Sequence, residues 1–311
     1  MIVSDMSDYT IISQPFYSMI IIVSVCKFCD DRMEETMSDI IIHNRMGRSV
    51  YKRLPAEISG QIDKEIYRVG LLGPDPYAAY RFFAMPLRHG VHEWMSIMHD
   101  EKTADFLIEM AKTAKTREMF SYLAGFLCHY ALDTTVHPYI DRLADNTGYM
   151  HVAIEHKLDL MELDKMGMDL RDRPITRNFY PPFLPKSMQG DLDEVFKKVY
   201  GWDDAYRMMK ASYRHHKMFY YLAEDPHGLI DRAFGGAPRD LIGGRLVTIS
   251  YRSHLCDGMT FDEFDGLRKK AVHKAIRLIE GADSFRKGTL SEAALRDMIG
   301  HTDYSGRPVT S

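Results

Sequence analysis

The stretch that decides the fold is FSYLAGFLCHYALDTTVHPY, residues 120–139. From residue 120 to residue 132 it is apolar almost all the way round, and only Ser121 and His129 interrupt the apolar run. A helix that is apolar on every side lies inside a helical bundle rather than on its surface. This stretch therefore predicts a buried central helix, against which the other helices pack.

His129 and Asp133 are four residues apart in this stretch, so they share one face of the predicted helix. Tyr122 and Phe126 fall on the same face, which directs the polar pair into the interior. A buried carboxylate is unfavourable unless it is paired or binds a metal. The pair is therefore a candidate for metal binding.

More histidine–acid pairs follow in the sequence. His137 comes just before Pro138, which predicts a bend or a helix end there. His151 and Glu155 repeat the spacing of four, whereas His156 falls about 100° further round and is not expected to join them. With 14 histidines and 44 acids among 311 residues, composition predicts roughly two such pairs by chance, and the sequence contains five. Spacing alone leaves open a metal site or a set of hydrogen-bonded core histidines.

Asp75 lies between Pro74 and Pro76, so the backbone around it is restricted and a helix cannot run through it. A rigid loop that presents one carboxylate suits a metal ligand or a general base, although an ordinary turn has the same sequence. Three histidines follow at spacings that allow one of them to be a ligand: His89, His92 and His99.

Composition narrows the class of protein. The net charge is −4 and the sequence has no basic block, which argues against stable binding of nucleic acid. Four cysteines do not make a disulfide framework in a chain of 311 residues. Cys26 and Cys29 form an isolated C-x-x-C. It has the spacing of half a zinc knuckle, but no second pair exists, so we interpret it as a chance pair or a redox motif.

Helical periodicity covers residues 56–70, 100–116, 151–161, 191–222 and 259–279, and only residues 245–251 resemble a strand. The fold class is therefore all-α, a bundle of about eight to ten helices. We expect one domain over residues 37–285, with the metal-binding part in 38–160 and a helical remainder in 161–285. Residues 286–311 are a polar C-terminal tail, expected to be loosely held.

Residues 1–36 form an N-terminal extension, which is either disordered or an upstream misreading of the start. Its apolar run, residues 16–25, is too short to span a bilayer, where about 20 residues are needed. Asp5 and Asp8 precede that run, so it lacks the basic start of a secretory signal. We therefore expect a cytoplasmic protein, with a secreted or membrane-associated protein as the alternative.

The order of these motifs along the chain resembles the zinc-dependent phospholipase C family, whose superfamily also contains single-strand-specific zinc nucleases. The resemblance covers about residues 38–160. It is carried by His43, G-P-Asp75-P, His92, His129-x-x-x-Asp133, His137 and His151-x-x-x-Glu155. It implies an all-α fold with two or three zinc ions per chain.

The resemblance also implies a role for each of these residues. One zinc would be held by Asp75, His92, His129 and Asp133. A second would be held by His137, His151 and Glu155, and a third by His43 together with a bridging Asp133. Asp75 would also act as the base that orients the attacking water. Imidazole and carboxylate ligands suit zinc, and a metal pair suits in-line displacement at phosphorus.

The sequence departs from the family pattern at two places. The secreted phospholipases begin with a tryptophan that binds the third zinc, whereas the two tryptophans here are Trp94 and Trp202. Asp133 and His137 are four residues apart, where the family has a slightly longer gap. These departures put the third zinc in question.

The function implied by the resemblance is cleavage of a phospholipid by a zinc-dependent phosphodiester hydrolase, with possible transient contact to a membrane surface. Alternatives are a nuclease or other phosphoesterase on the same scaffold, and a helical metal-binding scaffold without activity. Four aromatic residues beside Asp75 are candidates to line a lipid or choline pocket, or are ordinary core residues: Tyr77, Tyr80, Phe82 and Phe83.

Overall fold

The computed structural model describes residues 40–84, 90–145, 148–170, 174–224 and 256–309. Its α-helices are α1 (Ile40–Tyr51), α2 (Ala56–Ser59), α3 (Lys64–Gly70), α4 (Trp94–Asp100), α5 (Thr103–Thr113), α6 (Arg117–Leu143), α7 (Gly148–Asp164), α8 (Ile175–Asn178), α9 (Gln189–Tyr200), α10 (Ala205–Glu224), α13 (Phe264–Arg286) and α14 (Glu292–Ile299). Three 3₁₀ turns join them: η2 (Asp75–Tyr77), η4 (Val91–Glu93) and η5 (Lys186–Met188).

This architecture confirms the all-α prediction. The described residues contain no strand, only an isolated bridge between Thr302 and Pro308. The predicted strand at 245–251, the extension 1–36 with Cys26 and Cys29, and His89 lie outside the described residues.

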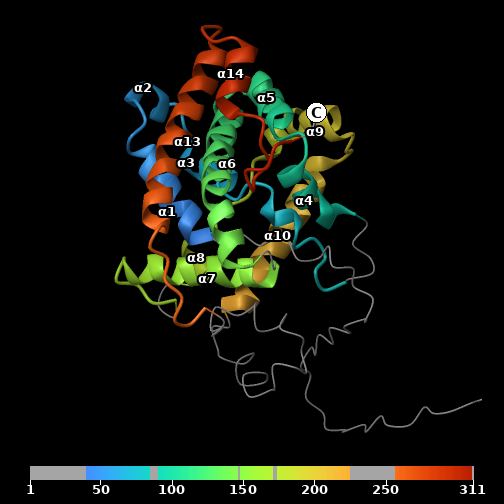
Figure 1. Ribbon diagram of the computed structural model, residues 1–311. Coiled ribbons are helices and arrows are strands. Elements are labelled where there is room, and N and C mark those ends of the chain that lie inside the picture. The colour runs from blue at the N-terminus through green and yellow to red at the C-terminus, as the bar shows by residue number, and fades with distance from the viewer. Residues whose placement is uncertain (1–39, 85–89, 146–147, 171–173, 225–255, 310–311) are drawn as a thin grey trace, which may run out of the picture.

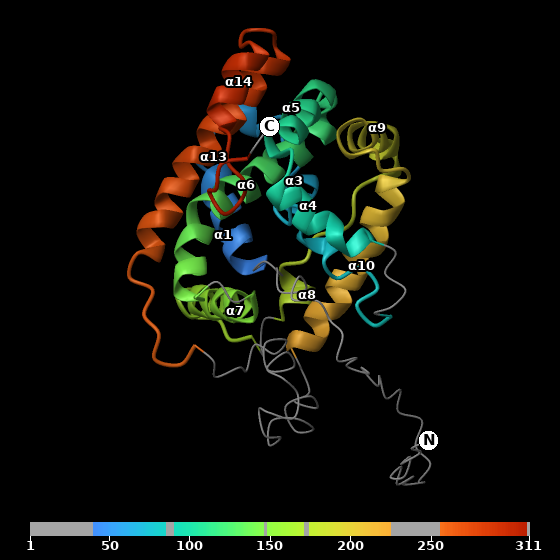
Figure 2. The ribbon, with the colours of Figure 1, turned by 45° about the vertical axis from the view of Figure 1, so that its right-hand side comes forward.

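Helix α6 is the centre of the bundle, as its apolar sequence predicts, and α13 and α3 pack along it (Figures 1 and 2). Thr116 caps its start, because the threonine hydroxyl accepts a hydrogen bond from the Met119 amide at 3.1 Å. Every residue from Met119 to Asp133 is buried. The helix can therefore carry polar groups only where something inside the protein binds them.

The sequence predicted a bend or a helix end at Pro138, and the helix end is wrong, since α6 continues to Leu143. A proline leaves the carbonyl four residues earlier without its amide partner, at a cost of about 3 kcal/mol. Pro138 itself is exposed, while the neighbouring Val136 and Tyr139 are buried and hold the helix in the bundle. His137 therefore stays on the same helical face as Asp133.

The predicted helix over residues 56–70 is in fact two helices, α2 and α3. Asp63 separates them, because its side chain caps α3 by accepting from the amides of Glu65 and Ile66. Helix α3 then crosses α6 very closely at two glycines. A Cβ atom on Gly125 would collide with the Tyr67 carbonyl, and one on Gly70 would collide with α6. Glycine is therefore required at both positions.

Helix α7 lies across the lower end of α6 in both views (Figures 1 and 2). It also fixes the start of α1, because the buried Asp159 accepts from the amides of Ile42 at 2.8 Å and Ile41 at 3.2 Å. A carboxylate at a helix N-terminus satisfies unpaired amides and the helix dipole. This contact sets the position of His43, one residue further along α1.

The C-terminal segment is not loosely held, contrary to expectation. After α13 the chain turns back as α14, with Leu295 and Ile299 buried, and Tyr304 is only 2% exposed. The Tyr304 amide donates to the His99 carbonyl at 3.0 Å. Three buried residues of this polar segment, Leu295, Ile299 and Tyr304, anchor it to the core.

None of the described helices combines the length and the apolar character that crossing a membrane requires.

Candidate metal centre

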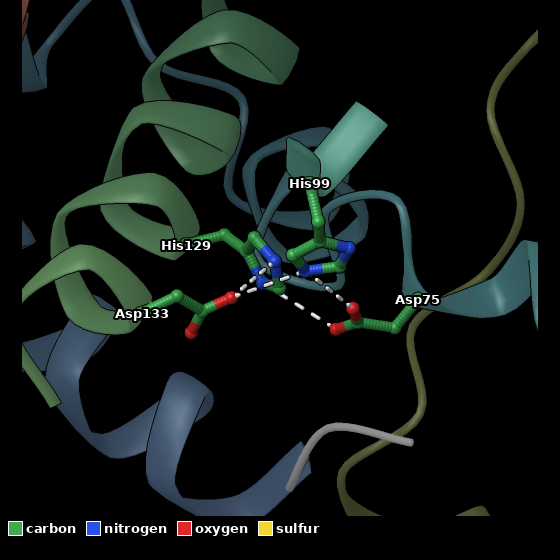
Figure 3. A group of neighbouring side chains, drawn as sticks. All are labelled: Asp75, His99, His129 and Asp133. Carbon is green, nitrogen blue, oxygen red and sulfur yellow. Dashed lines mark ion pairs between the residues drawn. The ribbon is translucent and has the colours of Figure 1, made fainter. Parts of the chain in front are cut away.

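Four side chains from three separate parts of the chain converge beside α6. Asp75 comes from η2, His99 from the last turn of α4, and His129 and Asp133 from adjacent turns of α6. All four are buried, and each offers a ligand atom within 4.8 Å of the others. In Figure 3 the two carboxylates lie on either side of the two imidazoles.

The two imidazoles of this group are oriented by the backbone. Nδ1 of His99 lies 2.9 Å from the Met95 carbonyl, and Nδ1 of His129 lies 3.2 Å from the Leu71 carbonyl. A carbonyl only accepts, so each neutral ring carries its proton on Nδ1 and keeps the lone pair of Nε2 for a ligand. Second-sphere contacts of this kind orient metal-binding histidines.

The atoms that face inward lack hydrogen bonds. Nε2 of His99 and of His129 are buried without a hydrogen-bond partner, and so are both carboxylate oxygens of Asp75 and Oδ2 of Asp133. His129 Nε2 lies only 2.8 Å from Asp133 Oδ2, but the geometry is not that of a hydrogen bond. Buried polar atoms are rarely unsatisfied in proteins, so this cluster indicates a ligand that bonds to all of them.

A second group lies one turn further along α6, where His137 meets His151 and Glu155 of α7. Glu155 Oε1 is 3.4 Å from His137 Nε2 and 3.2 Å from His151 Nε2. Both Nε2 atoms and Glu155 Oε2 are buried without a hydrogen-bond partner. Asp141 lies 2.7 Å from His151 Nδ1, so the Asp141 carboxylate orients this ring as the backbone carbonyls orient the others.

Asp133 lies between the two groups. Its Oδ2 faces His129, while its Oδ1 is 3.6 Å from His137 Nε2 and 3.3 Å from His43 Nε2. One carboxylate is therefore within reach of both groups and of His43. His43 itself belongs to neither group, and its ring stacks on that of His129 at 4.5 Å.

A small cavity of about 10 Å³ adjoins Asp133, which is room for about one water molecule. Its polar lining consists of His43, Asp133, His137 and Glu155, and its apolar lining of Ile42, Leu132, Val136, Ile140 and Phe264. Side chains from α1, α6 and α7 thus enclose a space next to the carboxylate that they share.

The first group contains His99, whereas the family resemblance of the sequence implied His92 at this place. His92 lies in η4, outside both groups, because Gly90 adopts a left-handed conformation and α4 begins only at Trp94. His99 lies on the buried face of α4 with Met95 and Met98. That apolar flank is the signal in the sequence that would have favoured His99.

His156 also lies outside both groups, as its position on the helix predicted. It is buried near the ring of Tyr220, at 6.3 Å. Burial lowers the pKa of His156 to about 4, against the opposing charge of Glu155. A neutral, buried imidazole on this side of α7 is therefore part of the core.

The sequence model of the zinc dependent phospholipase C family matches residues 42–213, which is more than half of the 311-residue chain. The chain belongs to the zinc dependent phospholipase C family. A search of curated proteins and a search of solved structures gave no match. The matched region includes every residue of the two donor groups, which are Asp75, His99, His129 and Asp133 in the first and His137, His151 and Glu155 in the second.

Family membership and the donors together support zinc as the metal and phosphodiester hydrolysis as the general reaction of this phospholipase C relative. Each group mixes imidazole nitrogens with carboxylate oxygens, which suits zinc. The unsatisfied Nε2 atoms and carboxylate oxygens show that the residues present fit such an ion.

The charges in the two groups are strongly coupled. Burial tends to lower the pKa of His99 and of His151, but the neighbouring carboxylates prevail and raise these pKa values to about 9 and about 10. Burial likewise tends to raise the pKa of Asp133 and of Glu155, yet the adjacent imidazoles hold the first well below its usual range and the second at about 2. Carboxylates kept ionised in this way attract a cation or a proton.

Tyr304 is a further residue at the site that the sequence did not indicate. Its ring lies 4.4 Å from that of His99 and 5.8 Å from that of His129. Because Tyr304 is more than 160 residues from either histidine, no local pattern could have placed it there. The C-terminal segment therefore forms one wall of the first group.

The aromatic residues beside Asp75 are mostly core residues. Tyr77 packs against Trp94 at 5.4 Å and Phe196 at 6.3 Å, and Tyr80 is buried. Phe83 is 46% exposed and is the one of the four that a large ligand outside the core could touch most readily.

Proposed function

We propose that this member of the family is a phospholipase C that hydrolyses the bond between the glycerol oxygen and phosphorus of a phospholipid, releasing a diacylglycerol and a phosphorylated head group. The observation that supports it best is the position of Asp133, whose two oxygens face two separate groups of buried donors. Donor groups that share a carboxylate suit neighbouring metal ions, as phosphodiester displacement requires.

Bound zinc ions would polarise the phosphoryl oxygens and lower the pKa of the attacking water. Asp75, His99 and His129 would hold one ion together with Asp133. Glu155, His137 and His151 would hold the second. His43 and Asp133 would contribute to a third, beside the small cavity that both of them line.

Asp75 is the proposed base. Its two oxygens have no hydrogen-bond partner among the described residues, so one of them is available to accept a proton from the attacking water. Restriction by Pro74 and Pro76 keeps the carboxylate in place without a supporting hydrogen bond.

The assay that tests this proposal compares two substrates on the zinc-loaded protein. We expect release of phosphocholine from phosphatidylcholine vesicles and no cleavage of single-stranded DNA, because the net charge of −4 repels a polyanionic strand. Cleavage of DNA alone would contradict the proposal and establish the nuclease alternative.

The number of ions is tested separately by metal analysis and anomalous scattering. The geometry leads us to expect at least two zinc ions per chain, one in each donor group. Fewer than two ions, without hydrolysis of either substrate, would support the inactive scaffold instead.

A further inference from the structure

A recess of about 440 Å³ lies between α13 and α14 (helices labelled in Figure 1). Its lining consists of Lys270, His273, Lys274, Arg277, Leu278 and Met298. None of these residues belongs to either donor group or to the small cavity beside Asp133. The volume is within the range of about 300–1,000 Å³ that is usual for sites of small ligands.

The polar lining of this recess is entirely basic. Lys270, His273, Lys274 and Arg277 follow one another at steps of three, one and three residues, so they share one face of α13. This face is about 10 Å long, since a helix rises about 1.5 Å per residue. It therefore suits one small anion or head group better than an extended polymer.

These cations are not neutralised within the described part of the chain, where none of Lys270, Lys274 and Arg277 forms an ion pair. Cations nearer the two ends of the same helix are paired, Arg268 with Asp265 and Arg286 with Asp283. The protein also has more acids than bases, 44 against 40. Three cations without an ion pair among the described residues thus line one hollow.

Lys274 forms the inner end of the recess. Its ammonium donates to the Thr134 hydroxyl at 2.6 Å and lies 4.8 Å from the centre of the Tyr130 ring. Burial lowers the pKa of this amine to about 8. A partly buried cation without a carboxylate is unfavourable, and a bound anion would offset that cost.

We propose that this recess binds a phosphate-bearing anion. Lysine ammoniums supply point charges, and the Arg277 guanidinium supplies a planar pair of donors for phosphate oxygens. Leu278 and Met298 add an apolar edge that suits a phosphate ester with a carbon skeleton, such as a phospholipid head group or a free phosphorylated glycerol. The site is separate from the metal centre and does not depend on its activity.

The test measures the NMR signal of the His273 side chain, because this histidine lines the recess and its chemical shift reports a ligand bound there. Zinc-loaded full-length protein with ¹³C-labelled histidines is titrated with inorganic phosphate and with glycerol 3-phosphate, and the His273 signal is assigned with His273→Gln. We expect this signal to shift and saturate. Signals of His137 and His151 report separately on phosphate at the metal centre.

Matched variants locate the binding. Lys270→Glu and Arg277→Glu should each weaken binding by about tenfold or more, because each removes a charge-assisted contact and adds a repulsion. Lys269→Glu makes the same change of charge at an exposed neighbour outside the recess, and it should change binding by less than about twofold. An equal loss in Lys269→Glu would overturn the site.

A second arm separates the two sources of phosphate. The protein is sedimented, before measurable turnover, with vesicles of phosphatidylcholine alone and of phosphatidylcholine containing phosphatidylglycerol. Binding of the free phosphates at His273 assigns the recess to a small phosphorylated ligand. Binding only to the anionic vesicles, with loss in Lys270→Glu but not in Lys269→Glu, assigns it to a lipid head group.

The inference is refuted if neither the free phosphates nor the anionic vesicles bind at the recess, whatever the hydrolase assay shows. Conversely, binding at His273 by a protein that cleaves no phospholipid would leave this inference intact and contradict the proposed function alone.

Discussion

At the scale of single residues, Asp133 faces four imidazoles, those of His43, His99, His129 and His137. Two of these histidines stand four residues before and four residues after it on α6, so one helix presents three donors in successive turns. This arrangement depends on α6 continuing through Pro138.

Asp133→Asn should abolish hydrolysis and reduce bound zinc, because an amide carries no charge and supplies one oxygen where the carboxylate supplies two. Zinc content by mass spectrometry and turnover of phosphatidylcholine measure the effect. Asp283→Asn is the matched control, since Asp283 is equally buried but pairs with Arg286 and Lys287. Full activity in Asp133→Asn would refute its shared role.

His99→Gln should lower zinc affinity by at least about tenfold, the size of effect expected for a residue at a metal site. His92→Gln should leave zinc affinity within about twofold, because His92 lies outside both donor groups. Competition with a chromogenic chelator gives both affinities. The reverse order of effects would show that His92, not His99, is the ligand.

At the scale of elements, the metal centre is assembled by two contacts with α6 and one with α4. Helix α3 approaches α6 closely where Gly70 meets Gly125, and it leads into η2, which carries Asp75. Helix α7 brings His151 and Glu155 to the lower end of α6. The C-terminal segment reaches back to α4, where the Tyr304 amide holds the His99 carbonyl.

Tyr304→Ala should destabilise the protein by about 3–5 kcal/mol, the usual cost of deleting a large buried aromatic side chain. It should also weaken zinc binding, because the ring packs against His99. Tyr304→Phe keeps the ring and should retain zinc. Urea unfolding with and without zinc measures both effects, and unchanged stability in Tyr304→Ala would mean that the C-terminal segment does not support the site.

At the scale of the whole molecule, the buried charges link pH, stability and metal binding. In the metal-free chain the pKa of His99 is about 9 and that of His151 about 10, both above the usual value of 6.5. Their contribution to stability is complete below about pH 6.5 and is lost as the pH rises through 9 to 10. Zinc and protons compete for the same imidazole nitrogens, so zinc affinity rises as the pH rises and these histidines lose their protons.

We therefore expect the free energy of unfolding of the chelator-treated protein to fall between about pH 7 and pH 10, while zinc affinity rises over the same interval. Urea unfolding follows the first change. Calorimetry in buffers of different ionisation enthalpy counts the protons that zinc releases. Zinc affinity that is independent of pH in this interval would contradict the proposed protonation of His99 and His151.

The sequence alone determined the class of fold, the burial of residues 120–132, and seven of the eight residues expected at the metal centre: His43, Asp75, His129, Asp133, His137, His151 and Glu155. All seven lie in the two donor groups or, for His43, beside them. Helical spacing is a local property, so pairs four residues apart can be read from the chain. Their roles as ligands stay predictions until zinc is measured.

Only the tertiary structure placed His99 rather than His92 beside Asp75, His129 and Asp133, carried α6 through Pro138, and brought Tyr304 to the site. Each of these depends on contacts between segments distant in sequence. Spacing allowed either histidine, and the packing of α4 against its neighbours selects the one that faces α6. The cost of a proline in a helix is local, but the burial that offsets it is not.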